Sequence, residues 1–349
     1  MAAFTPRTVF PALTSLPRSY YLGHHAAGLS KMRTLLNQID LIIECRDYRI
    51  PLTSRNPMFE GALAEKERII VYTKTDLGSD NPAEGMKARK LLKEFHAPAT
   101  TLFSDSQNTK SAHKILDLLR EKSMARDSLT GPHCMIVGMP NVGKSTLLNA
   151  LRATGVRKGK AAPTGAQPGI TRSIGTGVKI IDGSSLGGEE NDVYLLDTPG
   201  VFIPYVPDSG AMLKLALCGS VKDNVVPPFT LADYLLYHIN LRGLEGVYGT
   251  YCGPTNELGE VLDGMARKTG RLMKGGVPDW EGTALWMVQR WRNGFLGRFG
   301  LDDVTTAGLE KWRAKEVESE GTMSLNQARR KGKEMVRERA RRRRSVEAG

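Results

Sequence analysis

Residues 138–145, with the sequence GMPNVGKS, restrict the possible folds of this chain more than any other segment. They match the pattern GxxxxGK[ST] in the setting it requires, because the apolar run CMIVG leads into them and TLLNAL, the start of a helix, follows. In such a strand–turn–helix, glycines let backbone N–H groups surround phosphates, and the helix N-terminus adds positive potential. The segment therefore predicts an α/β fold that holds a nucleotide by its phosphates.

The residues of this loop have separate chemical tasks. Lys144 is expected to reach the β- and γ-phosphates, and the Ser145 hydroxyl is expected to bind Mg²⁺. The remaining residues of the predicted phosphate-binding set lie beside these two in the chain: Asn141, Val142, Gly143 and Thr146.

Two further segments complete the predicted phosphate site. The strand VYLLD (193–197) runs into DTPG, where Asp197 can hold the hydration shell of Mg²⁺ and the Gly200 N–H can contact the γ-phosphate. A polar, glycine-rich stretch upstream ends in PGITR, and its Thr171 is the candidate switch threonine that completes the Mg²⁺ shell when GTP is bound. Lys144, Thr171 and Gly200 are thus expected to be catalytic, with a plain surface turn as the alternative at Thr171.

The choice of base is predicted to come from a motif that lies earlier in the chain. The buried strand IIVY (69–72) is followed by TKTD, and the Asp76 carboxylate can accept hydrogen bonds from guanine N1–H and the 2-amino group. Adenine offers neither donor, and the stem of Lys74 can lie across the base. This resembles the guanine-specificity motif N/TKxD. Thr73 stands where many GTPases have Asn, which is expected to weaken one tether beside the base.

The order of these motifs is unusual, because the guanine motif follows the phosphate-binding loop in ordinary GTPases and precedes it here. Ser104 and Asp105 occupy the place of the loop that closes over the base, although they depart from its usual pattern. The same sheet with moved termini is a circular permutation. Six strands, enough for a parallel sheet with helices between them, are expected at 39–44, 69–72, 100–103, 134–138, 178–181 and 193–197.

On these motifs the chain resembles the circularly permuted GTPases of the YlqF-like class, and within them the members that assemble mitochondrial ribosomes. The resemblance implies a P-loop GTPase fold, GTP hydrolysed to GDP and phosphate, and a helical domain after the G domain. Tyr48 stands where the family usually has Ala. Six shared segments carry the resemblance besides the nucleotide motifs: GH (23–24), DLIIE (40–44), DYRIP (47–51), SRNP (54–57), GGVPD (275–279) and RNGFLG (292–297).

The group that positions the attacking water is left open by the sequence. Many GTPases use a glutamine shortly after DTPG, whereas Val201 and Phe202 stand here, as in the family's hydrophobic substitution. Asn141 matches a position that in related GTPases ligates K⁺, and His24 matches a family histidine proposed to act near the γ-phosphate. Either arrangement predicts slow turnover that a ribosomal partner stimulates.

The net charge of +12 is concentrated at the two ends of the chain. Residues 1–39 contain four Lys or Arg and no acid, which fits a mitochondrial transit peptide or, alternatively, a frayed basic terminus. Residues 329–344 contain ten Lys or Arg and two Glu, which favours contact with an RNA backbone over plain solvation. The chain has no apolar stretch of about eighteen residues, which argues against a membrane-spanning helix.

The domain organisation predicted from these patterns has four parts. A targeting segment (1–20) precedes the permuted G domain (21–207), an all-helical domain (208–310) and a basic tail (311–349). Pro228 and Thr230 introduce one helix of the helical domain. A second helix is predicted by a 3.6-residue spacing, and its aromatic residues are expected in the core rather than as platforms for bases: Ala284, Met287, Val288, Trp291 and Phe295.

The predicted function is GTP hydrolysis during assembly of the large subunit of the mitochondrial ribosome, with the nucleotide state controlling association with the subunit and its rRNA. The expected cofactors are GTP or GDP and Mg²⁺, with K⁺ as a further candidate. The chain is expected to be a monomer in the mitochondrial matrix that binds no DNA, and the sequence leaves open whether it also contacts the inner membrane peripherally. The alternative is a GTP switch, regulatory or RNA-binding, with negligible hydrolysis and a non-ribosomal partner.

Overall fold

The computed structural model describes residues 4–11, 13, 23–63, 66–105, 108–124, 132–162, 175, 177–186, 192–202, 206 and 209–321. The chain forms two compact units, residues 1–302 and residues 303–349. Within the described ranges, no helix is both long enough and apolar enough to cross a membrane. Most of the predicted targeting segment and the tail beyond residue 321 lie outside the described residues.

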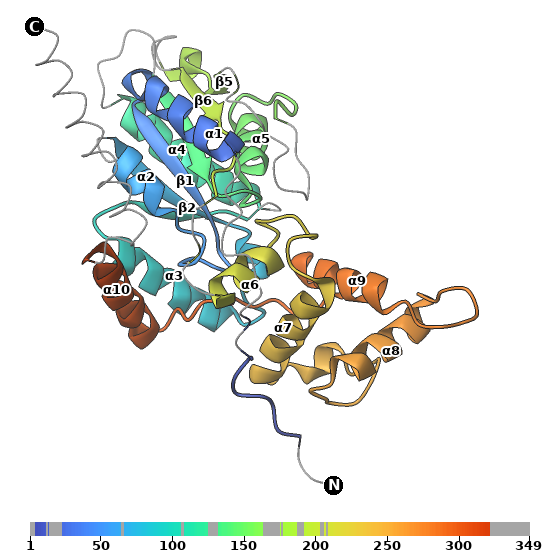
Figure 1. Cartoon of the computed structure of the whole chain (residues 1–349). Helices are drawn as coiled ribbons and strands as arrows, with labels where there is room; N and C mark the ends of the chain where they lie inside the picture. The colour runs from blue at the N-terminus through green and yellow to red at the C-terminus, as the bar shows by residue number, and fades with distance from the viewer. Residues whose placement is uncertain are drawn as a thin grey trace, which may run out of the picture. The chain divides into compact units, whose positions relative to one another are not determined.

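The first unit is built on a six-stranded sheet with the strand order β3-β2-β1-β4-β6-β5 (Figure 1). The strands lie within a few residues of the six predicted segments. They are β1 (Leu41–Asp47), β2 (Glu67–Thr73), β3 (Thr101–Phe103), β4 (His133–Gly138), β5 (Val178–Ile181) and β6 (Val193–Asp197).

Five strands are parallel, but the expectation of a wholly parallel sheet is wrong at one edge. β5 pairs antiparallel with β6, with Val178 opposite Leu195. A parallel pair needs a crossover of a dozen or more residues, usually a helix. The residues between β5 and β6 contain only the short 3₁₀ helix η3 (Gly183–Leu186), so the chain turns back directly. The carboxyl ends of the other five strands point to the same edge of the sheet.

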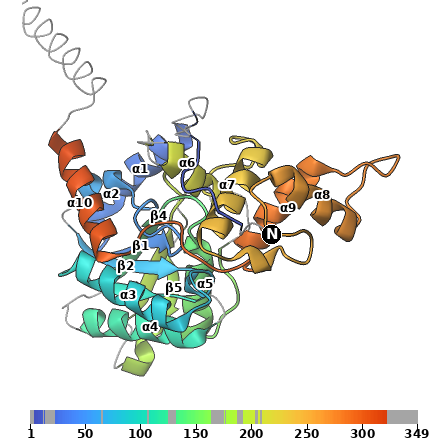
Figure 2. The same ribbon diagram turned by 90° about the horizontal axis from the view of Figure 1, so that it is seen from below.

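Helices cover both faces of the sheet, as Figure 2 shows. On one face, α1 and α2 pack against Ile42 of β1 and Met135 of β4. On the other face, α4 and α5 pack against Leu41 and Ile43, because neighbouring side chains of a strand point to opposite faces. The helices of this region are α1 (Gly23–Leu35), α2 (Pro57–Ala62), α3 (Pro82–His96), α4 (Thr109–Met124) and α5 (Lys144–Gly155).

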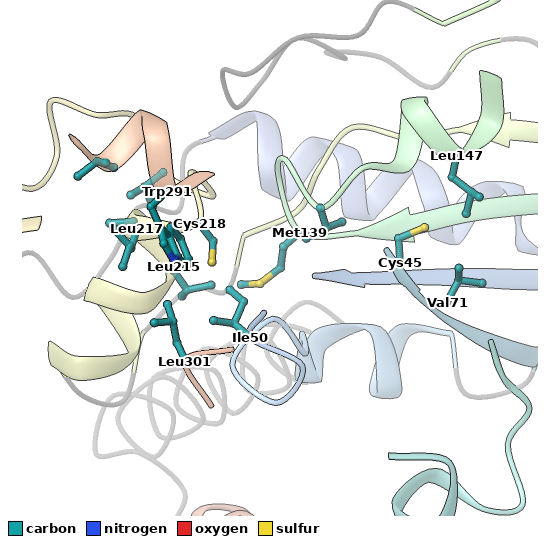
Figure 3. Packing of buried hydrophobic residues seen from close by; sticks show 14 of the residues in the cluster. Cys45, Ile50, Val71, Met139, Leu147, Leu215, Leu217, Cys218, Trp291 and Leu301 are labelled. Atoms are coloured by element: carbon teal, nitrogen blue, oxygen red, sulfur yellow. The ribbon is translucent and has the colours of Figure 1, made fainter. Parts of the chain in front are cut away.

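The sequence after β6 is helical, as expected. Its helices are α6 (Ser209–Leu217), α7 (Pro228–Leu241), α8 (Leu258–Thr269) and α9 (Trp280–Arg292), and α10 (Thr306–Gly321) lies in the second unit. The expected division of the chain near residue 208 stays a prediction. Apolar side chains of α6 and α9 belong to the same core cluster as the sheet. Figure 3 shows Ile50 and Met139 between the two groups, with Cys45, Val71 and Leu147 on the sheet side and Leu215, Leu217 and Trp291 on the helical side.

The two aromatic residues predicted at the core of the second helix differ in burial. Trp291 is 1% exposed, as expected for a core residue. Phe295 is 64% exposed, so its assignment to the core is wrong. The helix ends at Arg292, and Gly294 has a φ of +78°. This left-handed residue breaks the 3.6-residue phase before Phe295 is reached.

Candidate nucleotide-binding site

The predicted phosphate loop joins the end of β4 to the start of α5, at the edge where the parallel strands end. Asn141 (φ 57°) and Gly143 (φ 92°) both have left-handed backbone conformations, which curl the chain around a concave turn. Gly138 admits no side chain, because a Cβ there would lie 2.4 Å from the carbonyl oxygen of Cys45. The loop therefore has the backbone shape that phosphate binding requires.

Lys144 is 6% exposed and folds back across this loop. Its Nζ donates to the carbonyl oxygens of Met139 (2.9 Å) and Gly138 (3.3 Å). Burial lowers the pKa of Lys144 to about 8, and the attraction of the Asp197 carboxylate offsets this only in part. A buried cation whose hydrogen bonds go to carbonyl oxygens is a good receptor for an anionic ligand, because phosphate supplies the charge that the carbonyls lack.

Ser145 and Asp197 meet beside Lys144. The Ser145 hydroxyl donates to Asp197 Oδ2 at 2.7 Å, which brings the first turn of α5 and the end of β6 together. Hydroxyl and carboxylate oxygens are the ligand types that Mg²⁺ prefers, usually with waters and substrate phosphates in the other positions. These two residues fit a Mg²⁺ ion. Thr171, the third predicted ligand, lies outside the described residues.

The DTPG segment lies directly against the phosphate loop. The Thr198 hydroxyl donates to the Ile136 carbonyl (2.6 Å), and the Val201 N–H donates to the Gly138 carbonyl (3.2 Å). A Cβ at Gly200 would lie 2.5 Å from Pro140 Cα and 3.1 Å from Lys144 Nζ. Only glycine fits here, so the backbone of residue 200 lies next to the predicted γ-phosphate position.

The guanine motif is tied to the same loop from the other side. Lys74 has a left-handed backbone (φ 56°), and its Nζ donates to the Asn141 carbonyl (2.6 Å) and to Asp47 Oδ2 (2.9 Å). The Thr73 hydroxyl lies within hydrogen-bonding distance of the carbonyl oxygens of Val142 and Arg46. Threonine thus links the base motif to the phosphate loop, and the weaker tether expected beside the base stays a prediction.

Asp76 offers an unsatisfied acceptor. It lies in the 3₁₀ helix η2 (Thr75–Leu77), and its buried Oδ1 has no hydrogen-bond partner among the residues that the structure describes. Burial raises the pKa of Asp76, and the nearby Asp105 carboxylate adds to this. A buried carboxylate oxygen without a donor is costly, and guanine N1–H and the 2-amino group are donors of the right kind.

The predicted closing loop is joined to this motif. The N–H (3.3 Å) and hydroxyl (3.2 Å) of Thr75 both donate to the Ser104 carbonyl. The Asp105 N–H donates to Ser111 Oγ (3.2 Å), in the first turn of α4. The structure therefore brings Ser104 and Asp105 beside the guanine motif, as predicted.

A buried ion pair at the site was missed as a functional feature. Asp47 (0% exposed) accepts from Arg49 (2% exposed) through both carboxylate oxygens, at 3.0 and 2.8 Å, and from Lys74. Burial alone would raise the pKa of Asp47, but Arg49 and Lys74 outweigh it and hold the pKa below its usual range. The guanidinium of Arg49 also lies 4.9 Å from the ring centre of Trp291. The DYRIP segment was noted only as a family feature, and its two opposite charges two residues apart were the available signal.

The water-positioning group is not identified by this geometry. Val201 and Phe202 are both fully buried and cannot orient a water through a polar group. The Asn141 amide donates to the Gly219 carbonyl at 3.2 Å, so its side chain is directed toward the end of α6. His24 lies in the first turn of α1, and its side chain lies outside the described residues. The roles of Asn141 and His24 stay predictions.

Comparison with known proteins places these motifs in a family. Residues 133–231 match the family described as 50S ribosome-binding GTPase. The chain is 35% identical over 319 residues to mitochondrial GTPase 1 of Schizosaccharomyces pombe, covering 86% of this chain and 94% of the relative. It is 36% identical to mitochondrial ribosome-associated GTPase 1 of Mus musculus, with coverages of 85% and 93%.

A solved structure shares the fold. GNP-bound YlqF from T. maritima superposes with a TM-score of 0.51 at 24% identity, covering 79% of this chain and 97% of that one. The β/α order of the described structure, with the guanine motif before the phosphate loop, agrees with this match. The chain belongs to the YlqF-like family of circularly permuted GTPases, together with mitochondrial GTPase 1 and mitochondrial ribosome-associated GTPase 1.

Proposed function

We propose that this chain is a Mg²⁺-dependent GTPase that acts in the assembly of the large subunit of the mitochondrial ribosome. The unsatisfied carboxylate oxygen of Asp76 carries the choice of GTP, because guanine supplies donors where adenine has none. The similarity to mitochondrial GTPase 1 and to mitochondrial ribosome-associated GTPase 1, together with the basic ends of the chain, supports the ribosomal partner and the mitochondrial location.

The residues of the site have distinct roles in this proposal. Lys144 neutralises charge on the β- and γ-phosphates, and the Gly200 N–H contacts the γ-phosphate. Ser145, Asp197 and Thr171 would hold Mg²⁺, which when bound neutralises the charge that develops during phosphoryl transfer. The water is positioned either by K⁺ held at Asn141 or by His24, and the two arrangements are separable by ion dependence.

The experiment that tests this function is GTP hydrolysis in K⁺ and in Na⁺ buffer, with and without purified mitochondrial large subunits, beside a Lys144→Ala variant. Stimulation by the subunits that disappears in Lys144→Ala supports the proposal. A further dependence on K⁺ favours Asn141 over His24. Equal and feeble rates under all conditions exclude a ribosome-activated GTPase.

The full burial of Val201 and Phe202 favours a second candidate, a nucleotide-gated RNA-binding switch with negligible hydrolysis. The polar side chain that other GTPases use next to DTPG has no counterpart at these two positions. Single-turnover hydrolysis in the presence of large-subunit RNA separates the candidates. The switch predicts that GTP alters RNA affinity although no phosphate is released.

A further inference from the structure

A hollow of about 550 Å³ lies at the β3 edge of the sheet, between α3 and α4. Figure 2 shows α3 and α4 on the side of the sheet away from α1 and α2. We call this hollow the cationic groove, because five basic side chains and one acidic side chain line it: Arg89, Lys90, Lys93, Lys110, Lys114 and Asp105.

Most of the positive charge in the cationic groove is uncompensated. Lys93, Lys110 and Lys114 are exposed, and none of them has an ion-pair partner within the described part of the chain. Lys90 lies 3.9 Å from Glu94, but both side chains are exposed and such a pair is weak. Like charges at this density repel one another, so an anionic ligand would relieve an unfavourable arrangement.

Arg89 is held in place by aromatic rings. Its guanidinium lies 5.7 Å from the ring centre of Phe103 and 5.9 Å from that of Tyr48. Stacking of this kind restricts a long side chain, so less conformational entropy is lost when it binds an anion. The groove therefore combines one cation that contacts aromatic rings with several exposed lysines.

The spacing of the cations suits a chain of phosphates. On each helix the basic residues are separated by at most four positions, or roughly 6 Å along the axis. A nucleic acid strand carries one negative charge per nucleotide, so several of its phosphates can face a row of cations with this spacing. Both α3 and α4 carry basic residues with this spacing, and both helices line the cationic groove.

The cationic groove adjoins the loop predicted to close over the guanine base. Thr75 and Ser111 both line the groove. Thr75 holds the Ser104 carbonyl, and the Ser111 hydroxyl donates to the carbonyls of Asn108 (2.7 Å) and Asp105 (3.2 Å). A ligand in the groove would therefore touch the residues that fix the closing loop.

We propose that the cationic groove binds the phosphate backbone of RNA beside the guanine-closing loop. The inference deepens the proposed function, because it rests on that function for the ribosomal origin of the RNA. It gives the globular part of the chain an RNA contact separate from the basic tail.

The test uses the full-length chain and a fluorescein-labelled 20-base-pair RNA duplex, with binding measured by anisotropy over a range of KCl concentrations. The groove variant is Lys93→Gln/Lys110→Gln/Lys114→Gln. The matched control, Lys31→Gln/Lys87→Gln/Lys222→Gln, removes the same charge from exposed positions that do not line the groove. All three proteins carry the basic tail, so differences between them report the groove.

The groove variant is expected to lose at least about tenfold in RNA affinity, and its slope of log affinity against log salt should fall by about 2 to 3. The control variant should keep most of the RNA affinity and most of the salt dependence of the wild type. Equal losses in the two variants, or a groove variant that binds like the wild type, would overturn the proposal. A groove variant that loses only the binding of a labelled poly-glutamate peptide would identify an acidic protein partner instead.

Guanine nucleotide affinity, measured on the same samples, separates this proposal from the proposed function. The three lysines lie outside the nucleotide site, so the groove variant should bind GDP as the wild type does. Failure of GTP binding in every sample would refute the proposed function but leave the RNA comparison valid. Intact GDP binding without a difference in RNA binding would refute the groove alone.

Discussion

Replacement of Asp76 by Asn changes one atom of the base-binding motif and should reverse the choice of base. The Asp76 carboxylate can accept from both guanine N1–H and the 2-amino group, whereas the amide of Asn places an N–H where an acceptor is needed. Because Oδ1 is buried and has no hydrogen-bond partner among the described residues, a donor from guanine that reaches this oxygen does not have to replace an existing protein hydrogen bond.

Hydrogen bonds to a charged group contribute about 1.5 to 3 kcal/mol each. The Asn amide keeps one oxygen that can accept from N1–H, so one of the two bonds is lost. That loss predicts a decrease in GDP affinity of about 10- to 10²-fold in Asp76→Asn, since about 1.4 kcal/mol corresponds to a factor of ten. Xanthine has a carbonyl oxygen in place of the 2-amino group, so the Asn amide can donate to it. XDP affinity should therefore rise in the variant.

Titration calorimetry with GDP, XDP and ADP checks this prediction on the wild type and on Asp76→Asn. The melting temperature without nucleotide serves as the control for folding. The reasoning is refuted if a folded Asp76→Asn protein binds GDP within about threefold of the wild type, because Asp76 would then make no contact with the base.

Four other changes have expected outcomes. GTP affinity should fall by up to about tenfold per pH unit above pH 8, because the pKa of Lys144 is about 8 and only the ammonium form attracts phosphate. Calorimetry in buffers of different ionisation enthalpy should detect proton uptake on GTP binding above pH 8, and the absence of proton uptake would contradict this role of Lys144. Ser145→Ala removes the hydroxyl that meets Asp197 at 2.7 Å, so the Mg²⁺ concentration needed for half-maximal GTP binding should rise at least about tenfold in a Mg²⁺ titration, while binding in EDTA stays unchanged. Arg49→Met leaves the buried Asp47 carboxylate with Lys74 as its one remaining cationic contact among the described residues. The variant should lower the free energy of unfolding by about 3 to 5 kcal/mol in urea denaturation, with partial recovery in Arg49→Met/Asp47→Asn. Burial, aided by Arg242 and Lys214, lowers the pKa of His238 to about 3, so the imidazole is protonated in the unfolded chain at a higher pH than in the folded protein. The free energy of unfolding should therefore drop by about 2 kcal/mol between pH 7.5 and 5, and His238→Gln should remove this contribution to the pH dependence.

The strands could be predicted from sequence because each is an apolar run that ends in polar or glycine-rich residues. β1 was placed too early, at 39–44, because its end contains Glu44, Arg46 and Asp47. These charges are buried as pairs, with Arg46 2.7 Å from Glu44 and Arg49 2.8 Å from Asp47. A strand can continue through charged residues when oppositely charged residues two positions away neutralise them, and a search for apolar runs alone does not detect such pairs.

The nucleotide motifs could be located because the chemistry of phosphate and guanine binding needs particular residues at short spacings. The direction of β5 could not be predicted from such motifs, because it depends on the length of the connection to β6. The exposure of Phe295 could not be predicted either, because it depends on one left-handed glycine. The burial of Arg49 depends on Trp291, which is distant in sequence. Local patterns give no information about such a contact.

The ion pair of Asp47 and Arg49 connects the guanine motif to the helices that follow the sheet in this permuted chain. Lys74 of the guanine motif donates to Asp47, Asp47 holds Arg49, and Arg49 lies on Trp291 of α9. The Leu301 N–H also donates to the Arg49 carbonyl at 2.7 Å. A guanine base that draws Lys74 across its ring would weaken one of the two cationic contacts of a buried carboxylate.

Such a change cannot be absorbed by solvent, because Asp47 is fully buried. The remaining Asp47–Arg49 contact must then carry the whole charge, and Arg49 cannot move without disturbing its packing on Trp291. A second contact runs in parallel, since the Asn141 amide of the phosphate loop donates to the Gly219 carbonyl after α6. The phosphate loop is therefore bonded to the chain just after α6, and the base motif is connected to α9 through Asp47 and Arg49, so a nucleotide that displaced either motif would perturb contacts of the helical part of the first unit.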